Sequence, residues 1–551
     1  MSVDQAIADS GADADTVSED LGFRNIHYFA AAATKYGTLA KGGYEYDGKS
    51  YDGMFAHVEG YTTCIECHNS HTLEIKLEEC QECHENDELT IASADDLKNI
   101  RMAGSEVDFD GDADMEEGIA GELTGLQEIL LASIQAYANE VAGKAIAYDA
   151  ASYPYFFLDA NANGAIDEGE GRFDAWTPRL LKAAYNYQTS IKDPGAYAHG
   201  GKYIIELLYD SIEDLNGSIA SPVDMATLRR IDHGHFAGSE EAFRHWDEEG
   251  VVPGSCAKCH SAAGLPQFIA EGAVVSQMPA NGFECTTCHN DLAEYTLYEV
   301  KNVKFPSGAT IDSGDPDTNL CMMCHQGRES TVSVNKLIGD TEDDATSESL
   351  RFLNPHYFAS GATRFGTEAK GAYEYDGKEY AGFFDHGGVN NCTDCHGAHT
   401  QEVDWESCVE CHSEVSVEED LQNIRYTLAD YDGDGEDAEG VYFEIQDMRD
   451  ALSAAMQEYA TATVGKGIVY NGSSYPYFFV DTNANGEADA DEVNSDNSFK
   501  DWTPKLLRAA YNYQYSGKDP GAFTHNGKYI IQTLYDSLES LGADVSGMTR
   551  P

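Results

Sequence analysis

The stretch Cys64-Ile65-Glu66-Cys67-His68 is the first of seven copies of the pattern Cys-x-x-Cys-His, and these copies use all 14 cysteines of the chain. In this pattern the two thiols form thioethers to a c-type haem, and the adjacent imidazole binds the iron as its proximal ligand. The cysteines are Cys64, Cys67, Cys80, Cys83, Cys256, Cys259, Cys285, Cys288, Cys321, Cys324, Cys392, Cys395, Cys408 and Cys411, and the proximal histidines are His68, His84, His260, His289, His325, His396 and His412. The chain is therefore predicted to carry seven covalently bound haem c groups.

A Cys-x-x-Cys pair can also be half of a zinc ribbon or a thioredoxin-like redox pair. Neither of these sites needs a histidine in the next position. Histidine makes up only 18 of the 551 residues, so its presence after all seven pairs is not a chance result. Haem attachment is the interpretation that accounts for every cysteine.

Composition limits both the fold and the partners. Hydrophobic residues make up 42% of the chain and its mean hydropathy is -0.44, so the porphyrins are expected to form much of the core. The expected fold class is a multihaem cytochrome c, mostly irregular coil wrapped around stacked haems, with short α-helices and small β-hairpins. The net charge of -63 argues against nucleic acid and anionic membranes as partners, and it favours simple solubility over affinity for cations, mineral surfaces or basic proteins.

The location follows from the haem type. No run of about 20 apolar residues predicts a transmembrane helix, and Met1 to Gln5 lack the basic and apolar regions of a secretion signal. Haem attachment of this kind resembles that of exported cytochromes, which mature outside the cytoplasmic membrane. We expect an extracellular or outer-surface protein whose signal peptide has been removed or is missing from this sequence.

An internal repeat organises the chain. The repeated segments are Asn25–Phe29 with Asn354–Phe358, Tyr44–Lys49 with Tyr373–Lys378, Tyr153–Phe157 with Tyr475–Phe479, Trp176–Pro178 with Trp502–Pro504, and Lys192–Ala196 with Lys518–Ala522. Residues 22–214 and 351–541 are therefore interpreted as two copies of a module with two haems, calcium loops and a three-helix part. Residues 215–350 form an insert with three haem motifs and a linker. Residues 1–21 are an acidic N-terminal tail, expected to be mobile or to order against a partner, and residues 542–551 are a C-terminal tail.

Local patterns predict the elements of each module. The Asp-Gly of Tyr44–Lys49 suits a type I′ hairpin turn. Leucine and isoleucine recur at helical spacing from Leu123 to Val141, and Gly143 is a plausible stop. Thr177 followed by Pro178 is typical of a helix start and predicts a helix through Tyr187. Residues 202–215 are expected to form a third helix.

Eleven histidines outside the motifs are candidates for the distal face of the haem irons. The favoured set is His27, His57, His71, His235, His245, His356, His386 and His399, with His233 less favoured. His71 and His399 follow a proximal histidine by three residues and cannot fold back onto the same iron, so we expect them to bind the neighbouring haem of the same pair. His199 and His525 are candidates either for ligation at a module junction or for a hydrogen bond to a propionate. Imidazole on both faces gives a six-coordinate, low-potential iron without an open site.

Two kinds of acidic loop predict calcium sites. Asp159, Asn161, Asn163, Asp167 and Glu170 occupy positions 1, 3, 5, 9 and 12 of an EF-hand loop, and Asp481, Asn483, Asn485, Asp489 and Glu492 repeat the pattern. A second loop contains Asp108, Asp110, Asp112 and Glu117, repeated as Asp430, Asp432, Asp434 and Glu439. This second loop lacks the glutamate at position 12, so a solvated acidic turn is its alternative. We expect two to four calcium ions that rigidify the scaffold rather than signal.

With its Cys-x-x-Cys-His-x-x-His-Thr elements, its His-Tyr-Phe-Ala segments and Cys321–Ser330, the chain resembles large multihaem c-type cytochromes of the outer surface of metal-reducing bacteria. The resemblance covers nearly all of residues 22–541. It implies electron transfer from haem to haem, toward other cytochromes or extracellular acceptors such as metal oxides. Some such cytochromes polymerise into extracellular filaments with haems stacked along the axis and a histidine of one subunit on a haem of the next, a role that would suit His27.

The sequence alone leaves three functions open. The first is an extracellular electron conduit, as the subunit of a homopolymeric filament with haem stacking between subunits. The second is a monomeric or complex-bound electron carrier of the periplasm or outer surface. The third is a multihaem oxidoreductase, which needs one haem with an open face and is disfavoured by the surplus of distal histidines.

Overall fold

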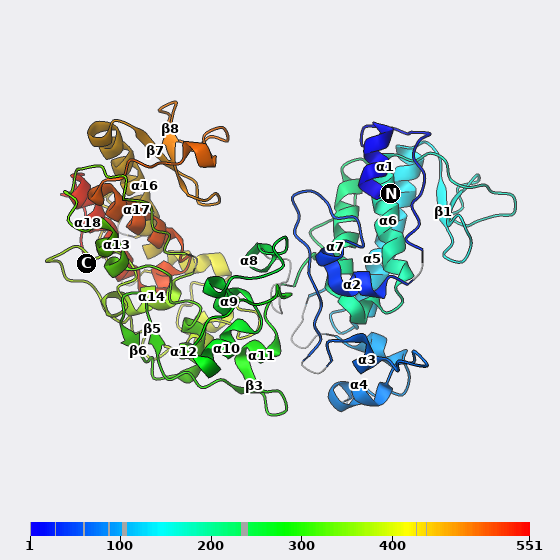
Figure 1. Cartoon of the computed structure of the whole chain (residues 1–551). Coiled ribbons are helices and arrows are strands. Elements are labelled where there is room, and N and C mark those ends of the chain that lie inside the picture. Colours follow the sequence, from blue (N-terminus) through cyan, green and yellow to red (C-terminus); the bar gives the residue numbers. More distant parts are fainter. Residues whose placement is uncertain are drawn as a thin grey trace. The chain divides into compact units, whose positions relative to one another are not determined.

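The fold is taken from a computed structural model, which describes residues 2–27, 29–58, 61–85, 89–101, 107–232, 241–356, 358–425, 427–436 and 438–551. The chain forms two compact units (Figure 1). The N-terminal unit contains Met1–Thr296 together with His399–Gln401, and the C-terminal unit contains Leu297–Ala398 and Glu402–Pro551. His233 and His235 lie outside the described residues.

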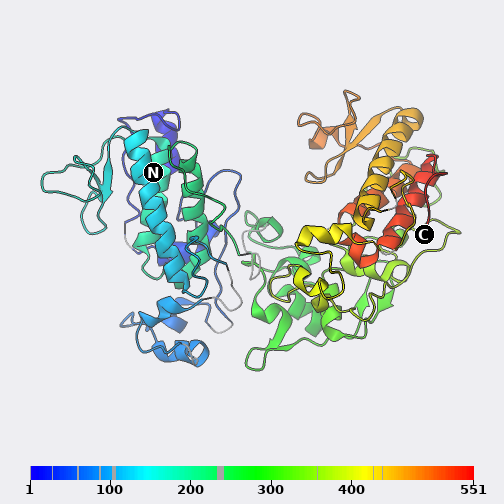
Figure 2. The ribbon, with the colours of Figure 1, turned by 180° about the vertical axis from the view of Figure 1, so that it is seen from behind.

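A three-helix part forms the core of the N-terminal unit. Helices α5 (Ile119–Glu140), α6 (Pro178–Lys192) and α7 (Ala196–Asn216) pack against one another, as Figures 1 and 2 show. The predicted apolar stripe of α5 is buried, with Leu126, Leu130 and Ile134 at 0% exposure. The predicted helix start is also confirmed, because the Thr177 hydroxyl accepts a hydrogen bond from the N–H of Leu180 at 3.1 Å.

The C-terminal unit contains the same arrangement of helices. Its members are α16 (Val441–Tyr459), α17 (Pro504–Gly517) and α18 (Ala522–Leu541). Thr503 caps α17 as Thr177 caps α6, by accepting from the N–H of Leu506 at 3.2 Å. Helix α6 runs to Lys192, beyond the predicted end at Tyr187, because packing in the bundle stabilises its last turn.

A small antiparallel hairpin precedes each EF-like loop. In the N-terminal unit β1 (Ile146–Tyr148) pairs with β2 (Phe156–Leu158), with Ile146 opposite Leu158. In the C-terminal unit β7 (Gly467–Tyr470) pairs with β8 (Phe478–Asp481). The loops that follow are therefore held by a strand at their start and not by a helix.

The remaining elements are short and separated by coil. The helices are α1 (Val3–Ser10), α2 (Ala31–Tyr36), α3 (Cys64–Cys67), α4 (Leu77–His84), α8 (Glu241–Arg244), α9 (Gly254–His260), α10 (Gly264–Glu271), α11 (Cys285–Cys288), α12 (Pro316–Met322), α13 (Thr331–Ile338), α14 (Ser360–Phe365) and α15 (Trp405–Cys408), and the strands are β3 (His289–Asp291), β4 (Thr296–Leu297), β5 (Val303–Lys304) and β6 (Thr310–Ile311). Short helices and two-stranded sheets with much coil agree with the expected class of multihaem cytochrome, although the bundle helices are longer than expected.

The expectation of a loose N-terminal tail is wrong for residues 2–20. Ser2 caps α1 by accepting a hydrogen bond from the N–H of Gln5 at 3.1 Å, and Val3 is only 6% exposed. Asp15 then accepts hydrogen bonds from the Tyr137 hydroxyl at 2.6 Å and the Arg179 guanidinium at 2.7 Å. The acidic residues that suggest a solvated tail are therefore partly used to attach the segment to the bundle.

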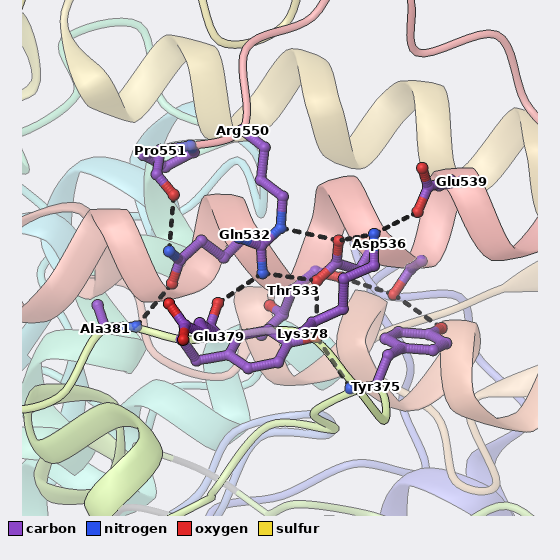
Figure 3. Close-up of polar contacts among 12 residues, drawn as sticks. Tyr375, Lys378, Glu379, Ala381, Gln532, Thr533, Asp536, Glu539, Arg550 and Pro551 are labelled. Atoms are coloured by element: carbon purple, nitrogen blue, oxygen red, sulfur yellow. Dashed lines mark hydrogen bonds and ion pairs between the residues drawn. The ribbon is translucent and has the colours of Figure 1, made fainter.

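The C-terminal residues 542–551 are also attached to their unit (Figure 3). The Arg550 guanidinium donates to both oxygens of Asp536 at 2.9 Å, and Gln532 donates to the carbonyl oxygen of Pro551 at 2.7 Å. Arg230 makes the corresponding contact with Asp210 in the N-terminal unit, at 2.9 and 3.0 Å. Each unit thus contains an equivalent ion pair, and the arginine of each pair lies outside the predicted modules, residues 22–214 and 351–541.

The predicted hairpin at Tyr44–Lys49 is wrong. A turn is present, because the N–H of Lys49 donates to the carbonyl oxygen of Tyr46 at 3.2 Å, but these described residues form no strand pair. Of Asp47 and Gly48 only the glycine has a positive φ, of 78°, whereas a type I′ turn needs two such residues. The buried amide of Asn186 binds both the N–H and the carbonyl of Tyr44, at 2.6 and 2.9 Å, and so replaces a partner strand.

Candidate haem sites and acidic loops

Several Cys-x-x-Cys-His motifs fold as one helical turn. The N–H of the histidine donates to the carbonyl oxygen of the first cysteine, at 2.8 Å from His68 to Cys64 and at 2.8 Å from His412 to Cys408. Residues three apart on such a turn lie on the same side, so both thiols can reach one porphyrin edge. The histidine that follows leaves the turn and can approach the iron.

The Nδ1 atoms of four motif histidines are held by backbone carbonyl oxygens. The distances are 3.2 Å from His68 to Leu73, 3.0 Å from His260 to Ala242, 2.8 Å from His289 to Tyr295 and 3.0 Å from His325 to Phe358. A carbonyl oxygen can only accept, so Nδ1 carries the proton and Nε2 keeps its lone pair. This is the orienting contact that metal-ligating histidines usually make.

Five motif histidines among the described residues face a second imidazole. The ring centroids are 5.7 Å apart for His57 and His84, 6.2 Å for His68 and His199, 6.3 Å for His289 and His399, 6.2 Å for His386 and His412, and 6.3 Å for His396 and His525. Two metal–imidazole bonds of about 2 Å each, plus about 1 Å from each nitrogen to its ring centre, require about 6 Å. The residues present therefore fit a haem iron with one imidazole on each face.

This pairing differs from the predicted one at His399. His399 faces His289 of the insert, whereas we expected it to serve the other haem of its own pair, His412, which faces His386. His199 and His525, for which the sequence leaves either ligation at a module junction or a propionate contact open, lie opposite the motif histidines His68 and His396. Their positions depend on the approach of α7 and α18 to the motifs, which no local pattern encodes.

A buried carboxylate holds each of these two histidines. Asp519, which is 2% exposed, lies 2.8 and 3.0 Å from Nδ1 of His525, and Asp193, which is 3% exposed, lies at 2.9 Å from Nδ1 of His199. Burial opposes a charge on His525, but the charge and the hydrogen bond of Asp519 raise the pKa of its imidazole on balance. Both aspartates belong to the repeated Lys-Asp-Pro-Gly-Ala segment, the one sequence signal that could have pointed to them.

The other candidate ligands are placed as follows. His27 and His356 both adopt a positive φ, of 78° and 75°, and donate their N–H to the side chain of the asparagine two residues earlier, at 3.0 and 2.9 Å. His245 Nδ1 lies 2.9 Å from Glu241, and its ring packs on Trp246 with 4.8 Å between the centroids. His71 is exposed on the turn after the first motif.

Thiols of successive motifs approach one another inside each unit. A hydrogen bond from Cys321 lowers the pKa of the Cys392 thiol to about 6. Burial, together with the neighbouring Cys408, raises the pKa of Cys395. In the N-terminal unit burial and the neighbouring Cys67 raise the pKa of Cys80. Porphyrins attached at these sulfurs would therefore be neighbours.

The second acidic loop brings carboxylates together. Oxygens of Asp108, Asp110 and Glu122 lie within 4.8 Å of one another, as do those of Asp110, Asp112 and Glu117. Burial and the adjacent carboxylates raise the pKa of Asp110 to about 6 and that of Glu117 to about 7. Such crowding of hard oxygen ligands suits a divalent cation such as calcium.

The C-terminal unit repeats this cluster. Its two groups are Asp430, Asp432 and Glu444, and Asp432, Asp434, Glu439 and Asp447. Glu122 and Glu444 were missed by the sequence pattern, which follows the loop only. Each is 0% exposed on the first turn of a bundle helix, where it pairs with Arg101 or Arg425 at 2.6 and 2.7 Å. The only signal for them was their identical spacing from Glu117 and Glu439.

The EF-like loops are closed by their own side chains. Asp159 accepts hydrogen bonds from the N–H groups of Asn163 and Gly164 at 3.1 and 2.7 Å, and the amides of Asn161 and Asn163 donate to Asp167 at 2.7 and 2.9 Å. Asp481, Asn483, Asn485 and Asp489 repeat these amide contacts. Each loop is therefore closed by hydrogen bonds among residues of the EF-hand pattern, and calcium binding there stays a prediction.

Among the described residues, none of the helices is both long enough and apolar enough to cross a membrane.

Comparison with known proteins places these sites in a family context. Residues 241–326 match the family model of cytochrome c7 and related cytochrome c. The C-type polyheme cytochromes OmcB and OmcC of Geobacter sulfurreducens are each 26% identical to the chain, over 413 and 463 residues. These alignments cover 62% and 70% of this chain, and 50% and 54% of the relatives. The chain thus spans about half the length of the curated relatives it matches, and it is homologous to polyheme c-type cytochromes. No solved structure matches it.

Proposed function

We propose that the chain is a seven-haem electron conduit that works outside the cell, with histidine on both faces of its haem irons. The single observation that carries this proposal is the set of five histidine pairs with ring centroids 5.7 to 6.3 Å apart. Each pair joins a motif histidine to a histidine outside the motifs. Homology to polyheme cytochromes supports electron transfer as the outcome.

The bound haems supply reversible one-electron exchange, and the chain supplies attachment, orientation and closure. The thioether cysteines fix each porphyrin edge, and the carbonyl contacts of Nδ1 aim the proximal imidazoles. A second imidazole on the opposite face would leave no position for a substrate at the five paired irons. This arrangement favours a carrier over an oxidoreductase.

The order of the motifs suggests a route within each unit. In the C-terminal unit the contact of Cys321 with Cys392 and the closeness of Cys395 to Cys408 would set three porphyrins side by side. In the N-terminal unit the closeness of Cys67 to Cys80 would do the same for two. The acidic loops, loaded with two to four calcium ions, would hold these haem segments on the helical bundles.

We further propose an extracellular or outer-surface location and assembly into a homopolymer with haems stacked between subunits. The haem type and the resemblance noted above support export. The partners would be other copies of the chain, other cytochromes, and extracellular acceptors such as metal oxides. The alternative is a monomeric or complex-bound carrier with the same internal route.

Two measurements test the proposal. The intact mass should equal that of the chain plus seven haems, and the ferric protein should show low-spin signals only and bind no carbon monoxide when reduced. A carbon monoxide adduct would demonstrate an open iron and favour an enzyme. Electron microscopy of haem-positive material from the cell exterior should show filaments, whereas discrete particles at every concentration would favour the carrier.

A further inference from the structure

The axial histidines fall into two classes by what their Nδ1 atoms contact. His68, His260, His289 and His325 face neutral backbone carbonyl oxygens. His199 and His525 instead face the carboxylates of Asp193 and Asp519, with both oxygens of each aspartate within 3.0 Å. The second class therefore occurs once in each unit, at the haem motif that begins with Cys64 or Cys392.

Burial makes the carboxylate contacts effective. Asp193 and Asp519 are 3% and 2% exposed, so water does not screen their charge. The other two carboxylates near an axial candidate differ, because Glu241 beside His245 and Glu414 beside His412 have side chains 76% and 59% exposed. The positive charge of Arg364 acts on His525 against the effect of Asp519. Among the described contacts, however, Arg364 makes no hydrogen bond to that imidazole.

We propose that Asp193 and Asp519 are positioning residues that lower the reduction potential of one haem in each unit. A carboxylate that accepts the Nδ1 proton makes the imidazole a stronger electron donor through Nε2. Stronger donation and a nearby negative charge stabilise ferric iron more than ferrous iron. These two haems would therefore be reduced last. In each unit, electron transfer onto the haem beside His199 or His525 would be the energetically unfavourable step.

This inference rests on the proposed function, because it requires His199 and His525 to be axial ligands. The test uses the haem-loaded full chain with Asp193→Asn, Asp519→Asn and the double substitution. Asparagine keeps the size and one acceptor oxygen but removes the charge. In a potentiometric titration followed by haem absorbance and low-temperature electron paramagnetic resonance, each single substitution should raise most the midpoint of the haem beside His199 or His525, and the double substitution should raise both. Asp519→Asn should also raise slightly the midpoint of the haem at His325, because the charge of Asp519 acts on that histidine as well.

Asp536→Asn is the matched control, because Asp536 is also 2% exposed but pairs with Arg550 and Lys378, outside the haem motifs. It should leave all midpoints unchanged. Asp519→Glu restores the charge and should return the midpoint toward that of the unmodified protein. Unchanged midpoints in Asp519→Asn with low-spin signals retained would overturn the inference. So would a new high-spin signal in that variant, because the aspartate would then act only by keeping the ligand bound.

The two proposals can fail separately. If His525→Ala adds no high-spin signal to the spectrum of the unmodified protein, His525 is not a ligand, which contradicts the proposed ligation before any aspartate is changed. Low-spin haems throughout, combined with insensitivity to the aspartates, would contradict only the present inference.

Discussion

His399 faces His289 with 6.3 Å between the ring centroids, although His399 follows the motif Cys392–His396 and His289 ends the motif that begins with Cys285. A histidine three residues after one motif histidine thus lies opposite another motif histidine far away in the chain. His399–Gln401 accordingly belong to the N-terminal unit, while the residues on either side belong to the C-terminal unit.

Replacing His399 with alanine should therefore open one iron, at the haem attached to Cys285 and Cys288. The expected result is one carbon monoxide bound per reduced chain and one new ferric high-spin signal. A chain with Cys285→Ala and Cys288→Ala, which lacks that haem, provides the control. His399→Ala should add no carbon monoxide binding to it, and an adduct there would assign His399 to a different haem.

The sequence can indicate haem attachment because the motif is local and its chemistry needs only five consecutive residues. It also predicts α5 and α6, because a buried stripe and a Thr-Pro cap are visible within one helix. The axial pairs cannot be predicted in this way. Whether His199 or His71 reaches an iron depends on where α7 approaches the first motif, and the energy that decides it comes from packing between distant segments.

The sequence patterns also miss the hairpins and the buried glutamates, because neither leaves a clear local signal. Strands β1 and β2 have three residues each, too few for an alternating pattern to stand out. In the sequence, Glu122 is indistinguishable from the acidic residues that are common in the first turn of a helix. Its role appears only in space, where it accepts the N–H groups of Phe109 and Asp110 at 2.8 and 3.2 Å and holds the acidic loop.

Removal of divalent cations should destabilise the protein, and more so at pH 7.5 than at pH 5.5. Burial raises the pKa of Asp110 to about 6 and that of Glu117 to about 7. Without a cation, the folded state therefore keeps protons that the unfolded chain loses, and stability falls as the pH rises from about 4 to 7. Calcium favours the charged carboxylates and offsets this loss.

Thermal unfolding with calcium or with a chelator, at both pH values, measures this effect. The difference in Tm should be larger at pH 7.5, because protons compete with calcium at pH 5.5. A chain with Glu117→Gln and Glu439→Gln should show a smaller calcium effect. An equal gain in Tm at both pH values would argue that these loops are not the calcium sites.

Glu122→Gln should lower the free energy of unfolding by about 3 kcal/mol, because it leaves the buried Arg101 without its charged partner. The two side chains are 2.6 Å apart and are 0% and 11% exposed. The measurement is denaturant unfolding of the haem-loaded chain. Glu116→Gln changes an exposed glutamate of the same loop and should stay close to the unmodified protein. Equal losses in the two variants would mean that the ion pair contributes nothing.

Thr503→Ala should destabilise the C-terminal unit by about 1 to 2 kcal/mol through the loss of a helix cap. The Thr503 hydroxyl accepts the N–H of Leu506 at 3.2 Å and lies 3.1 Å from the hydroxyl of Tyr459, which in turn donates to Asp344 at 2.8 Å. Because the threonine is fully buried, alanine leaves the N–H of Leu506 without a solvent replacement. Amide hydrogen exchange should show faster exchange in the first turn of α17, with the bundle of the N-terminal unit unaffected. Thr124→Ala, an exposed threonine within α5, is the matched control, and a similar effect from both substitutions would contradict a specific capping role.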